Sequence, residues 1–113
     1  MADPILVSRD GAIATVTLNN PERLNALDKA MWRRLGEAMR ELAADETLRC
    51  IVLRGSGDKA FAAGADISEF AIERANARQA KEYGGIIHET MQAVARCRHP
   101  TVAMIKEIGR AHV

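Results

Sequence analysis

The feature of this sequence that most restricts its fold is the alternation of short apolar runs with longer stretches of helical periodicity. Apolar residues recur at steps of three and four through residues 28–44 and again through 75–98, a spacing that places them on one side of a helix. Compact apolar runs at 13–18, 50–55 and 101–105 have the length and composition of strands. Strand, helix, strand, helix, strand predicts right-handed crossovers over a largely parallel sheet, and therefore an α/β fold.

Turn and capping residues mark where these elements begin and end. A further short run at 5–8 is followed by Arg-Asp-Gly, which predicts an N-terminal hairpin with the run after it. Asp28 is the candidate N-cap of the first helix. Gly84 and Gly85 each weaken the second helix by about 1 kcal/mol relative to Ala and form its candidate bend or break, while Pro100 ends it. The residues predicted to face the core are Met31, Leu35, Ala38, Met39 and Leu42 in the first helix and Tyr83, Ile87, Met91, Val94 and Cys97 in the second.

The composition is that of an ordinary globular chain. Of 113 residues, 48% are hydrophobic and 27% charged, and 16 Lys and Arg against 15 Asp and Glu leave a net charge of +1, so nothing in the charge favours nucleic acid or an anionic membrane as a partner. Cys50 and Cys97 lack metal-ligand spacing and are interpreted as reduced core thiols. The N-terminus resembles neither a signal nor a transit peptide, and no apolar run approaches membrane-spanning length; we expect a cytoplasmic location.

Small residues follow the strand predicted at 50–55. Within "FAAGADISEF", residues 61–70, the stretch from Ala62 to Ala65 has too little bulk to fill a core. One interpretation is a plain turn. The other is that a ligand approaches the backbone there and uses its N–H groups.

Three segments, in this order, resemble the crotonase family, also called the enoyl-CoA hydratase/isomerase superfamily. "VTLNNPERLNALDKAM" resembles its N-terminal signature, "IVLRGSGDKAFAAGADISEF" resembles its second signature, and "RCRHPTVAMIK" is similar to a helix end and the strand after it. The resemblance covers roughly residues 5–106. It implies that residues 1–106 are the N-terminal portion of a crotonase-like domain, a truncated spiral of ββα units, whose parent protein forms trimers or dimers of trimers.

The same resemblance assigns a role to the small-residue stretch. In the family, the residue after the glycine of Ala-Ala-Gly-Ala-Asp gives its backbone N–H to the thioester oxygen of an acyl-coenzyme A, and here that residue is Ala65. Coenzyme A is then part of the substrate, and we expect no separate cofactor and no metal. The positions that match the family's substrate-binding residues are Leu24, Ala26, Ala63, Ala65, Asp66 and Ile67.

Other notable side chains have simpler interpretations. Arg23 and Lys59 are candidates for the phosphates of the nucleotide, although solvated side chains explain both residues more simply. His88 is predicted to be surface or partly buried without a chemical role, and His99 to be a cation at the end of a helix. Trp32 lies one step off the apolar stripe and is predicted to pack against a neighbouring element.

By resemblance the parent protein is an enoyl-CoA hydratase, a lyase that adds water to the 2,3 double bond of enoyl-CoA thioesters in fatty acid metabolism. Hydration needs a base and an acid, usually two carboxylates. Asp66, Glu69 and Glu73 match no catalytic position of the family, so we expect this polypeptide itself to be inactive. The alternatives are an isomerase or another acyl-CoA enzyme of the family, and a non-catalytic RNA-binding or assembly member. Two placed glutamates after Lys106 would indicate a hydratase, one an isomerase, and none a binding or assembly protein.

The last seven residues depart from the family pattern. After Lys106 the family has Gly and a Gly-rich turn, whereas this chain continues as Glu-Ile-Gly-Arg-Ala-His-Val. We expect residues 107–113 to be a non-native tail translated from foreign DNA. Sequencing the source DNA past the codon for Lys106 tests this expectation.

Overall fold

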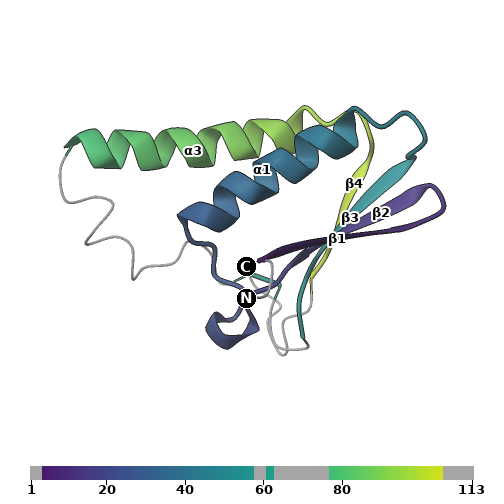
Figure 1. Ribbon diagram of the computed structural model, residues 1–113, viewed down its shortest axis with the longest axis horizontal. Helices are drawn as coiled ribbons and strands as arrows, with labels where there is room; N and C mark the ends of the chain where they lie inside the picture. Colours follow the sequence, from purple (N-terminus) through teal and green to yellow (C-terminus); the bar gives the residue numbers. More distant parts are fainter. Residues whose placement is uncertain (1–3, 58–60, 63–76, 106–113) are drawn as a thin grey trace.

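The computed structural model describes residues 4–57, 61–62 and 77–105. Its elements follow one another in the predicted order (Figure 1). They are β1 (Ile5–Asp10), β2 (Ile13–Leu18), the short 3-10 helix η1 (Pro21–Arg23), α1 (Lys29–Ala43), β3 (Cys50–Gly55), α3 (Ala77–Ala95) and β4 (Thr101–Met104).

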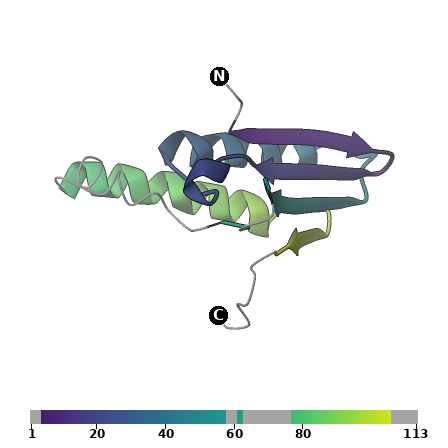
Figure 2. The same ribbon diagram turned by 90° about the horizontal axis from the view of Figure 1, so that it is seen from below.

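The four strands form one sheet in the order β1-β2-β3-β4 and lie side by side in Figure 2. β1 pairs with β2 in an antiparallel hairpin, as predicted, and extends to Asp10. β2 pairs with β3 and β3 with β4 in parallel, with Leu18 opposite Gly55 and Arg54 opposite Met104. Two of the three pairings are parallel, which confirms the predicted largely parallel sheet.

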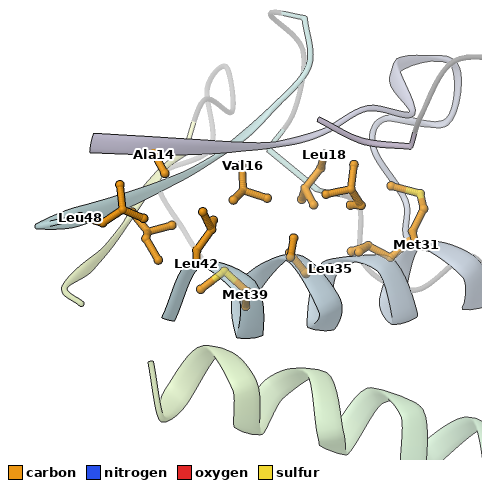
Figure 3. Packing of buried hydrophobic residues seen from close by; sticks show 12 residues of the cluster. Ala14, Val16, Leu18, Met31, Leu35, Met39, Leu42 and Leu48 are labelled. Atoms are coloured by element: carbon orange, nitrogen blue, oxygen red, sulfur yellow. The ribbon is translucent and has the colours of Figure 1, made fainter. Parts of the chain in front are cut away.

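Helix α1 packs directly on the sheet. It begins after Asp28, whose Oδ1 accepts a hydrogen bond from the N–H of Met31 at 2.8 Å, so the predicted N-cap is confirmed. Figure 3 shows the side chains of β2 and of the loop before β3 facing the apolar stripe of this helix. The labelled members of this core are Ala14, Val16, Leu18 and Leu48 on the sheet side and Met31, Leu35, Met39 and Leu42 on the helix.

Helix α3 packs against α1, and its buried stripe differs from the prediction. Met91 is 54% exposed, whereas Thr90 is only 2% exposed. The Thr90 hydroxyl donates to the carbonyl oxygen of Trp32 at 2.6 Å, and Gly36 of α1 leaves room for it, since a Cβ there would lie 3.0 Å from Thr90 Oγ1. The prediction that Met91 faces the core is wrong because a threonine with a satisfied hydroxyl occupies the contact.

The extent of α3 also differs from the prediction. The helix continues through Gly84 and Gly85 without a break. A Cβ at either position would meet nothing within 4 Å, so no neighbouring element presses on the helix at these glycines. It ends at Ala95 rather than at Arg98, because a tighter turn follows in which the N–H of Cys97 donates to the carbonyl of Val94. Its amino-terminal end projects beyond α1 (Figures 1 and 2).

The face of the sheet opposite α1 carries apolar side chains that are exposed. Leu6, Ile13, Val102 and Met104 are each between 43% and 50% exposed, and the strand register places them on this one face. We call these four residues the open face. Cys50 pairs with Ile13 on the same side, so its prediction as a core thiol is wrong.

Two residues predicted to pack on the core do so. Cys97 packs against the core cluster, and both it and Cys50 are free cysteines. Trp32 also packs against this cluster, as predicted. These contacts place the turn after α3 and the first turn of α1 against the same core.

Candidate functional site

The loop of residues 19–27, which connects β2 to α1, contains two of the six predicted site residues. It starts at the carboxyl end of β2, where Leu18 lies opposite Gly55 at the end of parallel β3. The N–H of Ser56 donates to the carbonyl of Leu18 at 2.8 Å and joins these two strand ends. In open parallel sheets, ligands bind outside the carboxyl ends of the strands.

Two consecutive residues of the 19–27 loop adopt left-handed backbone conformations. Leu24 has φ 54° and Asn25 has φ 59°. A leucine in this region costs about 1–2 kcal/mol, and its side chain is 46% exposed, so apolar packing does not explain the conformation. Strain of this kind at a residue other than glycine is common at functional sites.

Hydrogen bonds within the loop hold the backbone in this shape. The N–H groups of residues 23–26 donate to carbonyl oxygens at Asn20, Pro21, Asn20 and Arg23, at 3.0, 3.2, 2.8 and 3.0 Å respectively. These four N–H groups are therefore used within the loop, and its exposed side chains are the surface that it offers to a ligand.

Two asparagine amides fix the loop from inside. Asn25 is 1% exposed; its Oδ1 accepts from the N–H of Asn20 at 2.9 Å, and its Nδ2 donates to the carbonyl of Ser56 at 3.0 Å. The Nδ2 of Asn20 donates to the carbonyl of Ala26 at 2.9 Å. Sequence reasoning included both asparagines only as letters of a motif. The signal it missed is that asparagine tolerates positive φ and offers a donor and an acceptor together.

The structure describes only part of the predicted site. Leu24 is exposed and Ala26 is 9% exposed, two residues apart in the same loop. Phe61 and Ala62, which precede the other predicted residues, pack against the core cluster. The predicted site residues that lie outside the described part of the chain are Ala63, Ala65, Asp66 and Ile67.

The histidines and basic residues take separate positions. His88 is exposed on α3, as predicted. His99 does not cap a helix: α3 ends at Ala95, and the Nε2 of His99 lies 2.8 Å from the carbonyl oxygen of Asp45. Its predicted role as a helix-end cation is therefore wrong. Arg23 is exposed, and Lys59 lies outside the described residues.

Asp45 is the centre of a polar cluster at the other end of the sheet. Its pKa is lowered to about 2, first by hydrogen bonds from the hydroxyl and N–H of Thr47 and then by Arg9. The distances are 2.6 and 2.8 Å to Thr47 and 2.5 Å to Arg9. Arg9 lies near the hairpin turn, opposite Ala14 at the start of β2. The cluster therefore ties β1 to the loop after α1 and does not belong to the 19–27 loop.

A groove of about 960 Å³ lies between α1 and α3. Arg40, Ala44, His88 and Arg96 are among the residues that line it, so it lies toward the carboxyl end of α1, away from the 19–27 loop. Within the described part of the chain, no three His, Cys, Asp or Glu residues are grouped to hold a metal ion. Nor does any helix in that part have the length and apolarity to cross a membrane.

Solved structures with similar folds place this arrangement in a known architecture. A Magnetospirillum magneticum structure, described as an enoyl-CoA hydratase/carnithine racemase, is 49% identical to this chain with a TM-score of 0.89 and matches 94% of this chain and 40% of its own. An enoyl-CoA hydratase structure from Mycobacterium smegmatis is 37% identical with a TM-score of 0.86, matching 92% and 40%. These likenesses confirm the predicted crotonase-type α/β fold.

Sequence comparison gives the same result. A "probable enoyl-CoA hydratase" of Rhizobium meliloti is 38% identical over 104 residues, which are 91% of this chain and 38% of that protein. The chain thus spans about two fifths of the length of the relatives it matches. The family model of enoyl-CoA hydratase/isomerase matches residues 8–111. The chain belongs to the enoyl-CoA hydratase/isomerase family.

Proposed function

We propose that this chain is the acyl-thioester-binding portion of an enoyl-CoA hydratase. In this proposal the 19–27 loop contacts the coenzyme A part of the substrate through Leu24 and Ala26, and the small-residue stretch holds the thioester group. The observation that carries the proposal is the strained, exposed Leu24 beside the buried Asn25, at the carboxyl ends of two parallel strands. Leu24 presents apolar surface to solvent from a backbone that is fixed by hydrogen bonds.

The proposed chemistry explains why a backbone donor is needed. The oxygen of water bonds to C3 of the enoyl thioester while a general base takes one of the water protons, and a general acid then adds a proton to C2. Negative charge gathers on the thioester oxygen before that proton arrives. A fixed N–H, here that of Ala65, stabilises this charge in the transition state, and such a donor contributes about 3–4 kcal/mol.

Two observations support the substrate class. The chain belongs to the enoyl-CoA hydratase/isomerase family, and relatives with about 37–49% identity carry enoyl-CoA hydratase in their names. The general acid and base that hydration requires are not assigned to any residue of this chain. The proposal therefore concerns binding and oxyanion stabilisation, and a test must supply the two carboxylates.

A hybrid enzyme provides that test. Residues 1–105 of this chain replace the matching part of the Mycobacterium smegmatis enoyl-CoA hydratase, whose fold superposes with a TM-score of 0.86; we call this protein the hybrid. We expect it to hydrate crotonyl-CoA, followed by the loss of the enoyl thioester's ultraviolet absorbance, with kcat/KM within about tenfold of the host enzyme. The control is the host lacking that part, which we expect to be inactive.

Folding and function are separated by a second measurement. The hybrid is compared with the host by circular dichroism and by sedimentation, so that an unfolded protein is not mistaken for an inactive one. A hybrid that folds and assembles like the host but does not hydrate crotonyl-CoA would contradict the proposal.

A further inference from the structure

The amide of Asn25 connects two segments that are far apart in the sequence. Its Nδ2 donates to the carbonyl of Ser56 at 3.0 Å, across 31 residues. We propose that Asn25 is a positioning residue that fixes the substrate-binding surface of the 19–27 loop against the carboxyl end of β3. This inference rests on the proposed function, because it gives the fixed surface a ligand.

Asn25 differs in this respect from Asn20. The Nδ2 of Asn20 donates to Ala26 at 2.9 Å and closes the loop on itself. The Nδ2 of Asn25 leaves the loop for Ser56, whose own N–H donates to Leu18 at 2.8 Å. The loop is therefore attached to both strand ends: to β2 by the chain and to β3 by the side chain of Asn25.

The burial of Asn25 makes this attachment specific. The residue is 1% exposed, while its neighbour Leu24 is 46% exposed. A buried amide that loses its partner cannot turn to water, so the bond to Ser56 is costly to break. The left-handed backbone at Asn25 turns its side chain inward next to the residue that presents apolar surface outward. One residue thus holds the loop while its neighbour faces the proposed ligand.

The consequence for the reaction concerns binding more than chemistry. Leu24 and Ala26 are assigned to the coenzyme A part of the substrate, which is bound equally in the ground state and in the transition state. Loss of such uniform binding raises KM and leaves kcat nearly unchanged. Disruption of the link between Asn25 and Ser56 is therefore expected to act on KM.

Two matched substitutions isolate the link. Asn25→Asp keeps the acceptor for the Asn20 N–H and the tolerance of positive φ, but removes the donor to Ser56. Asn20→Asp makes the same chemical change in the same loop and removes only the donor to Ala26. Asn25→Gly keeps the backbone conformation without adding a charge, so it separates loss of the amide from the effect of a carboxylate.

The first measurement uses the full 113-residue chain and needs no ligand. Hydrogen exchange is followed at the amides of Ala26 and Ser56 in wild type and in the three variants. We expect both Asn25 variants to speed exchange about tenfold or more at both amides. Asn20→Asp should speed exchange at Ala26 and leave Ser56 within about twofold of wild type.

The second measurement uses the hybrid with crotonyl-CoA. We expect Asn25→Asp and Asn25→Gly to raise KM about tenfold with kcat within about threefold, and Asn20→Asp to raise KM less than threefold. Equal KM effects of Asn20→Asp and the Asn25 variants, or no KM effect of either Asn25 variant, would overturn the inference. If the unsubstituted hybrid is inactive, the proposed function fails. Unchanged exchange at Ser56 in the Asn25 variants refutes the link itself.

Discussion

At the scale of single residues, one residue of the 19–27 loop fixes the loop by hydrogen bonds, and its neighbour exposes apolar surface. Asn25 is buried and makes hydrogen bonds at both ends of its amide, and asparagine is among the residues that accept its left-handed backbone. Leu24 has the same left-handed backbone, but its side chain cannot form hydrogen bonds, and leucine does not favour this conformation. A leucine is therefore kept at this position at a cost to stability, which fits a role in binding better than a role in packing.

The substitution Leu24→Asn tests this trade-off. Asparagine accepts φ near 54° more readily than leucine, so we expect unfolding to require about 0.5–1 kcal/mol more free energy. In the hybrid the same substitution removes apolar surface and should raise KM for crotonyl-CoA. Chemical denaturation and steady-state kinetics measure the two effects. A variant that is neither more stable nor weaker in binding would show that Leu24 is neither strained nor in contact with the substrate.

Asp45 provides a pH dependence whose sign is set by its environment. Its pKa in the folded chain is about 2, below the ordinary value of 3.8, because of Thr47 and Arg9. The carboxylate therefore stabilises the fold above about pH 4 and loses this contribution as the pH falls from about 4 to about 2. We expect wild type to melt at a higher temperature than Asp45→Asn at pH 5, and we expect this difference to shrink steadily as the pH falls from about 4 through about 2. A difference that stays constant over this range would contradict the assigned pKa.

At the scale of elements, the two long helices show which buried residues can be predicted from hydrophobic periodicity and which cannot. The stripe of α1 is predicted correctly because the residues of this stripe face the apolar side of the sheet, where apolarity alone decides burial. The stripe of α3 is predicted less well because it meets another helix. There Thr90 is buried in place of Met91, through a hydrogen bond to Trp32 and a gap above Gly36. Neither feature belongs to the periodicity of α3 itself.

The candidate site shows the same limit. Leu24 and Ala26 follow from a motif that is local in the sequence. The bond from Asn25 to Ser56 spans 31 residues and depends on how β2 and β3 are paired, which no local pattern specifies. Predicting it would have required knowing that the loop is buried against the end of β3.

Alanine substitutions at two glycines are expected to change the free energy of unfolding in opposite directions, because only one of them lies at the contact between α1 and α3. Gly84→Ala adds a methyl group where nothing lies within 4 Å, so we expect a gain of about 1 kcal/mol from helix propensity. Gly36→Ala places its Cβ 3.0 Å from Thr90 Oγ1 and pushes that hydroxyl from Trp32, which costs about 1–3 kcal/mol. Denaturant unfolding compares them. Equal stabilisation by both substitutions would show that α1 and α3 are not closely packed at Gly36.

At the scale of the whole molecule, helix α1 covers one face of the sheet, and no described helix covers the other. α1 buries the residues of β2 that point toward it, while Leu6, Ile13, Val102 and Met104 of the open face remain about half exposed. Exposed apolar side chains on one face of a sheet promote association in solution. The strand β4 at the edge of the described sheet adds backbone groups that can pair with another chain.

We therefore expect the 113-residue chain to have low solubility or to form oligomers when expressed alone. Val102→Glu should reduce association because it places a charge on the open face. Met91→Glu is the matched control, since Met91 is equally apolar and 54% exposed but lies on α3, and it should leave association unchanged. Analytical ultracentrifugation measures both. A monodisperse wild-type monomer with a cooperative thermal transition would contradict this expectation.

The central claim, that a backbone N–H of this chain stabilises the thioester oxygen, is tested most directly by the kcat of the hybrid with Ala65→Pro. Proline removes the N–H, and we expect kcat to fall about 100-fold or more. Ala65→Gly keeps the N–H and should retain most of the activity, and Ala65→Val keeps it but adds bulk, so it should raise KM more than it lowers kcat. Melting temperatures establish that each variant is folded. A folded Ala65→Pro hybrid with nearly normal kcat would contradict the claim.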